Sequence, residues 1–323
     1  MSVDVSIIIP TYNYGNYISV AIDSLLSQTY TNYEVMVIDD GSTDDTVNIV
    51  KSYNDNRIVY IYQQNQGANT ARNRGLEESQ GDYLIFLDAD DLLDPRHIEA
   101  YLNTAISYPG ANIYGPWVKG WFKNNKFHVL FEKGRCPGED LLEYWLDNWW
   151  IQTGCILWPR QNLFKIGGWD ESLHAAQDGD LAMRALVEDI PFVFCEEAPI
   201  AYVRDHKDNI SISSTKSLRT YCSRYRVLNK IEDLLKKKNR FSKKYKLNLA
   251  KKHLYFSIES SPKYPEFSKK CFRKFKQLNG FSTASVSFVT LCFFYLLGLD
   301  RKIRFENYIA GYASKFFKKL IKY

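Results

Sequence analysis

Three carboxylates within four residues, Asp88, Asp90 and Asp91, are the side chains of this chain best suited to chemistry. They directly follow the apolar run 84–87, which predicts a buried strand. Crowded anions raise one another's pKa unless a cation lies among them. Hard divalent ions prefer oxygen ligands, and Mg²⁺ commonly binds one or two carboxylates together with substrate phosphates. The loop therefore predicts a metal site, and a solvated acidic turn before a helix starting near Asp94 and Pro95 is the alternative.

The elements that would position this loop alternate between strands and helices. Apolar, β-branched runs predict strands at 5–9, 34–38, 57–62 and 83–87, and helical spacing predicts helices at 17–28, 44–53 and 69–79, the second capped by Ser42 or Thr43. Such alternation favours right-handed βαβ units and a parallel sheet, whose ligands bind beyond the carboxyl ends of the strands. The polar loops after these strands should therefore converge on one rim. The first strand is not followed by G-x-G-x-x-G and the chain has no Walker A lysine, which argues against a dinucleotide dehydrogenase and a P-loop NTPase.

Charge is distributed unevenly along the 323 residues. Residues 1–216 carry a net charge of −15 and residues 217–323 a net charge of +20, which indicates two regions with different roles. Helical patterns continue past the acidic half, at 218–235 and 241–257. The six cysteines form no C-x-x-C pair, so a zinc site is not expected. The first residues lack the pattern of a signal peptide, and we expect a cytoplasmic protein with reduced thiols.

Six ordered motifs carry a resemblance to a known family. They are residues 8–13 (IIPTYN), 27–30 (SQTY), 37–44 (VIDDGSTD), 71–75 (ARNRG), 87–91 (LDADD) and 167–171 (GGWDE). With these motifs, residues 4–213 resemble the family 2 glycosyltransferases, which have the GT-A fold. The resemblance implies an α/β fold, a Rossmann-like mixed sheet flanked by helices, as in nucleotide-diphospho-sugar transferases. It implies a catalytic domain over 1–216, with a nucleotide-sugar half at 1–110 and an acceptor half at 111–216, before a basic helical region at 217–323.

The resemblance also implies how a sugar-nucleotide donor is bound. Pro10, Thr11 and Tyr12 would close the first strand, with Tyr12 against the nucleobase. Asp40 would accept a hydrogen bond from the uracil of a UDP-sugar, the favoured donor. Arg72 would reach the donor phosphates, with Arg74 as the competing candidate. Asp88 would orient the acidic loop, and Asp90 would contact the ribose or the metal.

A Mn²⁺ or Mg²⁺ ion is implied as cofactor, with Asp90, Asp91 and His206 as its candidate ligands. A lone histidine is more often a surface or packing residue, and that alternative remains open for His206. Arg204, which belongs to the same segment, is expected to pair with the diphosphate if this loop closes.

Transfer with inversion needs a general base that removes the proton of the acceptor hydroxyl. The family has a carboxylate at the start of a helix after a Gly-Gly-aromatic-Asp turn, often as Glu-Asp, and this chain has Gln177 and Asp178 there. We assign the base to Asp178 and keep Asp180 as the alternative; simple charge stabilisation of the helix N-terminus would explain either residue.

The turn that precedes this helix implies the acceptor side of the site. Gly168, Trp169 and Asp170 would contact the acceptor, with the ring of Trp169 stacked on a sugar. A structural explanation is available for the same residues, because Gly168 would also serve as a helix C-cap.

The last residues suggest contact with a membrane. Residues 281–299 carry no charge, but five Ser and Thr in the first half favour an interfacial helix over a spanning one. Residues 301–323 are basic, aromatic and amphipathic, which suits anionic lipid, although a helical lid on the catalytic domain fits as well. No recognisable nucleic-acid module accompanies the charge, and no nucleic-acid partner is expected.

The sequence thus predicts an inverting glycosyltransferase, peripheral at the inner face of the cytoplasmic membrane. It would transfer a sugar from a UDP-sugar to a glycan or lipid-linked acceptor in the synthesis of a bacterial surface polysaccharide. The alternative from another class is a non-catalytic protein of the same fold that binds sugar nucleotides or glycans.

Overall fold

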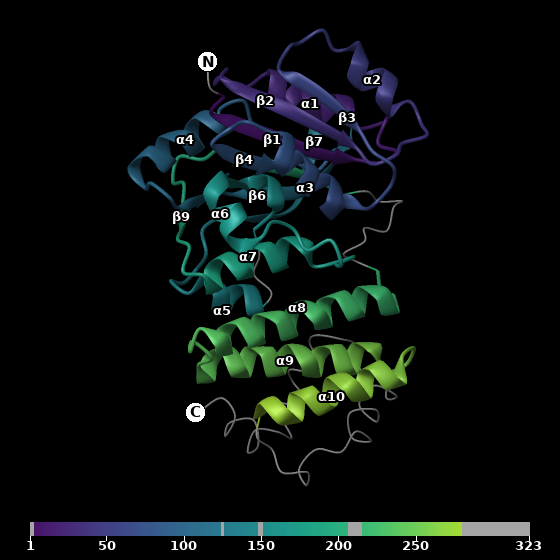
Figure 1. The fold of residues 1–323 in the computed structure, drawn as a ribbon, viewed down its shortest axis with the longest axis vertical. Helices are drawn as coiled ribbons and strands as arrows, with labels where there is room; N and C mark the ends of the chain where they lie inside the picture. Colours follow the sequence, from purple (N-terminus) through teal and green to yellow (C-terminus); the bar gives the residue numbers. More distant parts are fainter. Residues whose placement is uncertain (1–2, 124–125, 148–150, 206–214, 280–323) are drawn as a thin grey trace. The chain divides into compact units, whose positions relative to one another are not determined.

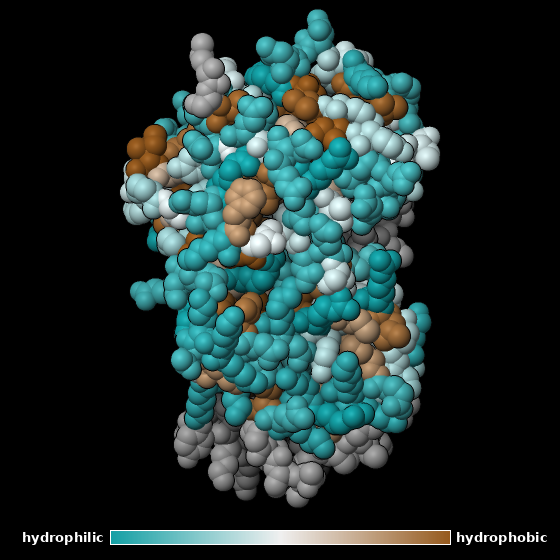
Figure 2. All heavy atoms as spheres, in the orientation of Figure 1, coloured by the Kyte–Doolittle hydropathy of each residue, from teal (hydrophilic) through white to brown (hydrophobic). Residues whose placement is uncertain are grey.

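The computed structural model describes residues 3–123, 126–147, 151–205 and 215–279. The chain forms two compact units, Met1–Phe241 and Ser242–Tyr323. Figure 1 traces the elements along the chain, and the face seen in Figure 2 is mostly hydrophilic with isolated apolar patches. The candidate site lies in the first unit.

A seven-stranded mixed sheet forms the core of the first unit. Its strands, in spatial order, are β3 (Ile58–Tyr62), β2 (Tyr33–Asp39), β1 (Val5–Thr11), β4 (Tyr83–Phe86), β8 (Ile156–Pro159), β5 (Asn112–Tyr114) and β9 (Phe192–Phe194). The four N-terminal strands are parallel, as the alternating pattern predicts, and β8 runs antiparallel to both β4 and β5. This confirms the expected mixed sheet flanked by helices.

Helices follow the parallel strands because each strand must be covered on both faces. They are α1 (Ile18–Leu26), α2 (Thr46–Ser52), α3 (Ala68–Glu78) and α4 (His97–Ser107). The apolar residues of β1 are completely buried. Helix α3 crosses β1 so closely that a Cβ at Gly75 would lie 2.4 Å from Cγ2 of Ile8. Only glycine permits this close packing of α3 on β1.

Helix α2 begins later than the sequence predicts. We expected a cap at Ser42 or Thr43, but the helix starts at Thr46. The carboxylate of Asp44 explains the shift, because it accepts hydrogen bonds from the backbone N–H groups of Thr46 (3.1 Å) and Gly15 (2.9 Å). These bonds hold residues 42–45 as a loop that is tied to the segment after β1.

A small second sheet adjoins the acidic loop. It contains β6 (Trp117–Lys123), β7 (Lys126–Lys133) and β10 (Ala201–Arg204), with β6 in the centre. An antiparallel bridge joins Leu92 to Tyr202, so β10 lies directly beside the residues that follow the acidic loop. The remaining elements before the basic region are α5 (Leu141–Leu146), a 3-10 turn at Thr153–Cys155, α6 (Arg160–Ile166) and α7 (Gln177–Val187).

The first unit extends beyond the boundary that the charge distribution suggested. Helix α8 (Leu218–Lys237) contacts α7 and belongs to the first unit, so the division falls after Phe241 instead of after residue 216. Charge alone did not reveal this because α8 is basic on its surface while its apolar stripe is buried.

In the second unit, α9 (Lys243–Ser260) and α10 (Pro265–Asn279) pack against each other. Among the helices of the described residues, none is both long and apolar enough to cross a membrane. The segments 281–299 and 301–323, for which membrane contact was predicted, lie outside the described residues.

Candidate active site

The site lies where the strand order reverses. From β1 the sheet continues through β2 to β3 on one side, and β4 lies on the other side of β1. In open α/β sheets the crevice outside the carboxyl ends of the strands at such a point is the usual ligand site. The segments that end there are Pro10-Thr11 at the end of β1, Asp39-Asp40 at the end of β2, and the acidic loop after β4. The predicted convergence of polar loops at one rim follows from this topology.

The first carboxylate of the acidic loop is paired with Arg72 of α3. An Nη2 atom of Arg72 donates to Oδ1 of Asp88 at 2.8 Å. Burial raises the pKa of Asp88, the charge of Arg72 opposes this rise, and the negative charges of Asp178 and Asp90 add to it. The electrostatic influence of Asp178 shows that α7 brings its first turn near the acidic loop.

Asp91 is the most buried carboxylate of the loop, with 4% of its surface exposed. Its Oδ1 accepts the backbone N–H of Arg204 (2.9 Å) and its Oδ2 accepts Nε2 of Gln152 (3.4 Å). Burial, together with the charges of Asp90 and Asp88, raises its pKa well above the usual range. The hydroxyl of Tyr14 also has a raised pKa, from its burial and from the charges of the three carboxylates.

This electrostatic pattern tests whether a metal ion fits. Negative charge accumulates at the loop beyond what Arg72 neutralises, since the pKa values of Asp88 and Asp91 stay raised. A divalent cation would relieve that cost. Within the described part of the chain, no three His, Cys, Asp or Glu side chains converge as a complete metal site. Mg²⁺ in proteins is commonly held by one or two carboxylates together with substrate phosphates and water, and the donor set of this loop fits that pattern. His206, the third predicted ligand, lies outside the described residues.

Arg72 occupies the centre of the site. It is 5% exposed, and its Nη1 donates to Asn69 Oδ1 (3.2 Å) and to Gln177 Oε1 (3.3 Å). Its guanidinium carbon lies 4.6 Å from the ring centroid of Trp169, a cation–π contact. Arg72 thus joins the acidic loop, α3 and the start of α7. Arg74, the competing candidate, instead donates to the carbonyl oxygen of Tyr62 (2.8 Å).

The turn before α7 contacts Arg72 through the ring of Trp169. The ring of Trp169 is 2% exposed and meets Phe86 edge to face, with centroids 5.0 Å apart. Gly167 caps α6 in the left-handed conformation (φ 77°), one residue before the predicted cap, and Gly168 is left-handed too (φ 63°). The acceptor contacts predicted for Gly168, Trp169 and Asp170 stay a prediction. In the structure the Trp169 ring is buried between Phe86 and the guanidinium group of Arg72.

The nucleotide side of the site combines an exposed ring with a buried carboxylate. Tyr12 is 46% exposed, as a ring available to a nucleobase should be, whereas Thr11 beside it is buried and Pro10 is half-buried. Asp40 is 3% exposed and accepts the backbone N–H groups of Gln66 (2.8 Å) and Gly67 (2.7 Å). Sequence reasoning missed this second role, which holds the loop before α3. The predicted nucleobase contact of Asp40 stays a prediction.

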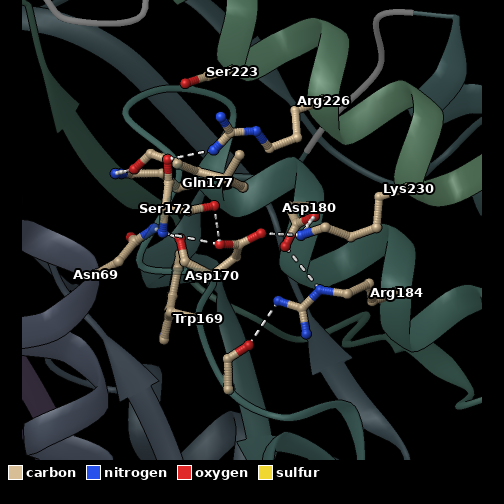
Figure 3. A network of polar contacts seen from close by, with 12 residues as sticks. Asn69, Trp169, Asp170, Ser172, Gln177, Asp180, Arg184, Ser223, Arg226 and Lys230 are labelled. Atoms are coloured by element: carbon tan, nitrogen blue, oxygen red, sulfur yellow. Dashed lines mark hydrogen bonds and ion pairs between the residues drawn. The ribbon is translucent and has the colours of Figure 1, made fainter.

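The two candidate bases have very different surroundings. Asp180 is completely buried and pairs with Arg184 Nε (2.8 Å) and Lys230 Nζ (2.7 Å) (Figure 3). Asp178 is half-buried, and within the described residues no hydrogen bond or ion pair holds its carboxylate. Residues two apart on a helix do not share a face. Asp180 is therefore neutralised within the fold, whereas the carboxylate of Asp178 lies on a different face of the helix.

An unusual backbone conformation precedes Gln177 and Asp178. Ala176 is left-handed (φ 58°, ψ 32°) at the N-cap of α7. For a residue with a Cβ this costs on the order of 1–2 kcal/mol, which surrounding contacts must offset. Sequence reasoning missed both this strain and the contacts from Lys230. A single alanine or lysine in a basic region gives no sequence signal of either.

Together, the fold and the site define a GT-A glycosyltransferase, with an acidic loop at the carboxyl end of β4 and a carboxylate on a facing helix. The sequence model described as Glycosyl transferase family 2 matches residues 6–167, half of the chain. The chain therefore belongs to glycosyltransferase family 2.

Individual relatives and structures agree with this class. A protein from Rickettsia typhi, described as an uncharacterized glycosyltransferase, is 37% identical over 186 residues, which are 56% of this chain and 58% of that protein. The chain thus spans little more than half of that relative's length. The crystal structure of S. aureus TarS residues 1–349 in complex with UDP-GlcNAc matches with a TM-score of 0.64 at 18% sequence identity. The match covers 86% of this chain and 83% of the TarS chain.

A second solved structure extends the agreement in fold. The mannosyltransferase PcManGT from Pyrobaculum calidifontis, in complex with GDP-Man and Mn²⁺, has a TM-score of 0.51 at 17% identity, over 94% of this chain and 82% of its own. At these identities the two structures establish the fold.

Proposed function

We propose that the protein transfers a sugar from a nucleotide-diphospho-sugar to an acceptor hydroxyl, with inversion at the anomeric carbon. One observation carries the proposal: Arg72 contacts both the acidic loop and the start of α7, which brings Asp178 near enough for its charge to raise the pKa of Asp88. A leaving diphosphate and an attacking hydroxyl need these two groups on either side of one anomeric carbon.

The chain's own residues have separable tasks in this reaction. Asp178 accepts the proton of the acceptor hydroxyl. At the same time the acceptor oxygen forms a bond to the anomeric carbon, and the bond between that carbon and the diphosphate breaks. Asp90 and Asp91 would hold Mn²⁺ or Mg²⁺, which supplies positive charge to the leaving diphosphate. Tyr12 covers the nucleobase.

UDP-sugars are the donors we favour, from the residue type of Asp40 and from the TarS complex, which contains UDP-GlcNAc. We further propose a glycan or lipid-linked acceptor in bacterial surface polysaccharide synthesis. The enzyme would then work at the inner face of the cytoplasmic membrane, in contact with anionic lipid through residues 281–323.

A donor screen tests the proposal. The protein is incubated with UDP-GlcNAc, GDP-mannose or dTDP-glucose, with Mn²⁺, Mg²⁺ or EDTA, and nucleotide release is measured for the wild type and for Asp90→Ala. We expect release from one donor, dependent on the metal and lost in the variant. Absence of both release and metal-dependent nucleotide binding by calorimetry would refute the transferase proposal.

The assignment of the base has its own matched comparison. Asp178→Asn should lower kcat by about 10²–10⁴-fold, the usual contribution of a general base, with an unchanged Kd for the nucleotide. Asp180→Asn removes a buried charge from between two cations and should destabilise the fold by about 3–5 kcal/mol. If instead Asp178→Asn retains full turnover, the base lies elsewhere.

A further inference from the structure

Helix α8 contacts the segment that leads to the proposed base, although α8 begins some fifty residues beyond the part of the chain that the family model matches. Ser223, Arg226 and Lys230 are spaced three and four residues apart, so they share one face of the helix. All three reach residues 170–180, which form the turn after Trp169 and the first turn of α7 (Figure 3).

Lys230 joins the two ends of this segment. Its Nζ contacts Oδ2 of Asp170, and also Oδ1 of Asp180 at 2.7 Å. Asp180 is fully buried, so its charge requires both Lys230 and Arg184. Although burial opposes it, hydrogen bonds from Lys230 and Ser172 lower the pKa of Asp170 to about 2. Two carboxylates and two cations thus form one neutral network across the turn.

Two further bonds hold the residues between these carboxylates. Arg226 Nη1 donates to the carbonyl oxygen of Ser172 (3.0 Å), and the backbone N–H of His174 donates to Oγ of Ser223 (3.0 Å). The held segment ends at the left-handed Ala176, directly before Gln177 and Asp178. Arg72, which pairs with Asp88 of the acidic loop, also contacts Gln177. The start of α7 is therefore held between α8 and the acidic loop.

We propose that Lys230 is a positioning residue for the general base: it fixes the Asp180 side of the first turn of α7 and thereby the direction of Asp178 on the other side. The inference rests on the proposed function, because it names how the base of that reaction is oriented. Displacements of about 1 Å at a reacting group lower rates by as much as 10²-fold, so loss of this contact should affect the chemical step.

The test compares Lys230→Met with Lys238→Met in the full chain. Lys238 is the residue that caps the C-terminal end of α8, and it pairs with Glu188 at the far end of α7 (2.7 Å), away from the proposed base. With the donor found in the screen, we expect Lys230→Met to lower kcat by about 10–100-fold with an unchanged KM for the donor. Lys238→Met, which removes an exposed pair, should stay within about twofold of the wild type. Lys230→Arg should recover most of the lost kcat, since its two terminal nitrogens can contact both carboxylates.

Hydrogen–deuterium exchange gives a readout that does not depend on turnover. Faster exchange at residues 171–178 in Lys230→Met, and not in Lys238→Met, supports the positioning role. Equal kcat or equal exchange in the two variants overturns it, as does a loss of kcat that Lys230→Arg fails to recover. A wild type that turns over no donor refutes the proposed function, whereas the exchange comparison still decides whether Lys230 orders the segment.

Discussion

Asp40→Asn should destabilise the protein more than Asp39→Asn, although the two carboxylates are neighbours and both are buried. Asp40 accepts three N–H groups: Oδ1 accepts Gln63 Nε2 (2.7 Å) and the backbone N–H of Gln66, and Oδ2 accepts the backbone N–H of Gly67. An amide has one oxygen, so whichever way it is turned at position 40, its NH₂ group faces a backbone N–H.

Asp39 provides the matched control because one of its partners is a hydroxyl. Oδ1 accepts the backbone N–H of Ser42 (2.8 Å) and Oδ2 accepts the hydroxyl of Tyr60 (2.6 Å). An amide at position 39 keeps the first bond through its oxygen and donates the second to Tyr60, whose hydroxyl can also accept. Both bonds therefore survive, with loss of the charge only.

The difference between the variants follows from the bonds that are lost. A buried donor without an acceptor costs about 1–3 kcal/mol, and bonds that lose their charge weaken further. Gln66 and Gly67 are exposed, so water can reach the released N–H, and the middle of this range applies. We expect the free energy of unfolding of Asp40→Asn to be about 2 kcal/mol lower than that of Asp39→Asn. For a unit of this size the corresponding difference in Tm is about 4–8 °C.

Thermal unfolding by circular dichroism measures this difference, and calorimetry with UDP and GDP separates the two roles of Asp40. If the carboxylate of Asp40 only holds the loop, its replacement should weaken the binding of UDP and GDP alike. If it also contacts uracil, its replacement should weaken the binding of UDP selectively. Equal Tm values for the two variants would refute the reasoning from the three donors.

Two other predictions concern stability. Gly75→Ala should lower the free energy of unfolding in urea by about 1–2 kcal/mol, because the new Cβ would lie 2.4 Å from Cγ2 of Ile8. The cost of this overpacking exceeds the gain in helix propensity. An unchanged unfolding midpoint would contradict the close packing of α3 on β1. Burial lowers the pKa of His97 to about 3. Since the unfolded chain takes up this proton near pH 6.5 and the folded chain does not, stability falls as the pH drops from about 6.5 to 3, by up to about 1.4 kcal/mol per unit. Urea unfolding at pH 7, 6 and 5 should show that His97→Phe lacks this loss of stability. The same pH dependence of the free energy of unfolding in both proteins would contradict the contribution of His97.

The sequence by itself determined the four parallel strands, the helices between them apart from the start of α2, and the rim of the sheet. These depend on local patterns: a β-branched run forms the buried β1, and loops after parallel strands converge wherever βαβ units form. The position of Asp88, Asp90 and Asp91 at the end of β4 follows for the same reason. The ordered motifs then indicated the family.

The tertiary structure decided what depends on contacts between distant residues. Arg72 contacts Gln177, 105 residues further along the chain, and only its ion pair with Asp88 shows which arginine meets the acidic loop. Asp178 and Asp180 look equivalent in sequence, because both are acids in the first turn of one helix. They differ because Lys230, on a helix beyond the predicted domain boundary, pairs with Asp180, whereas Asp178 stays half-buried and its charge acts on Asp88. Burial and ion pairing are properties of the packed chain, and no local pattern encodes them.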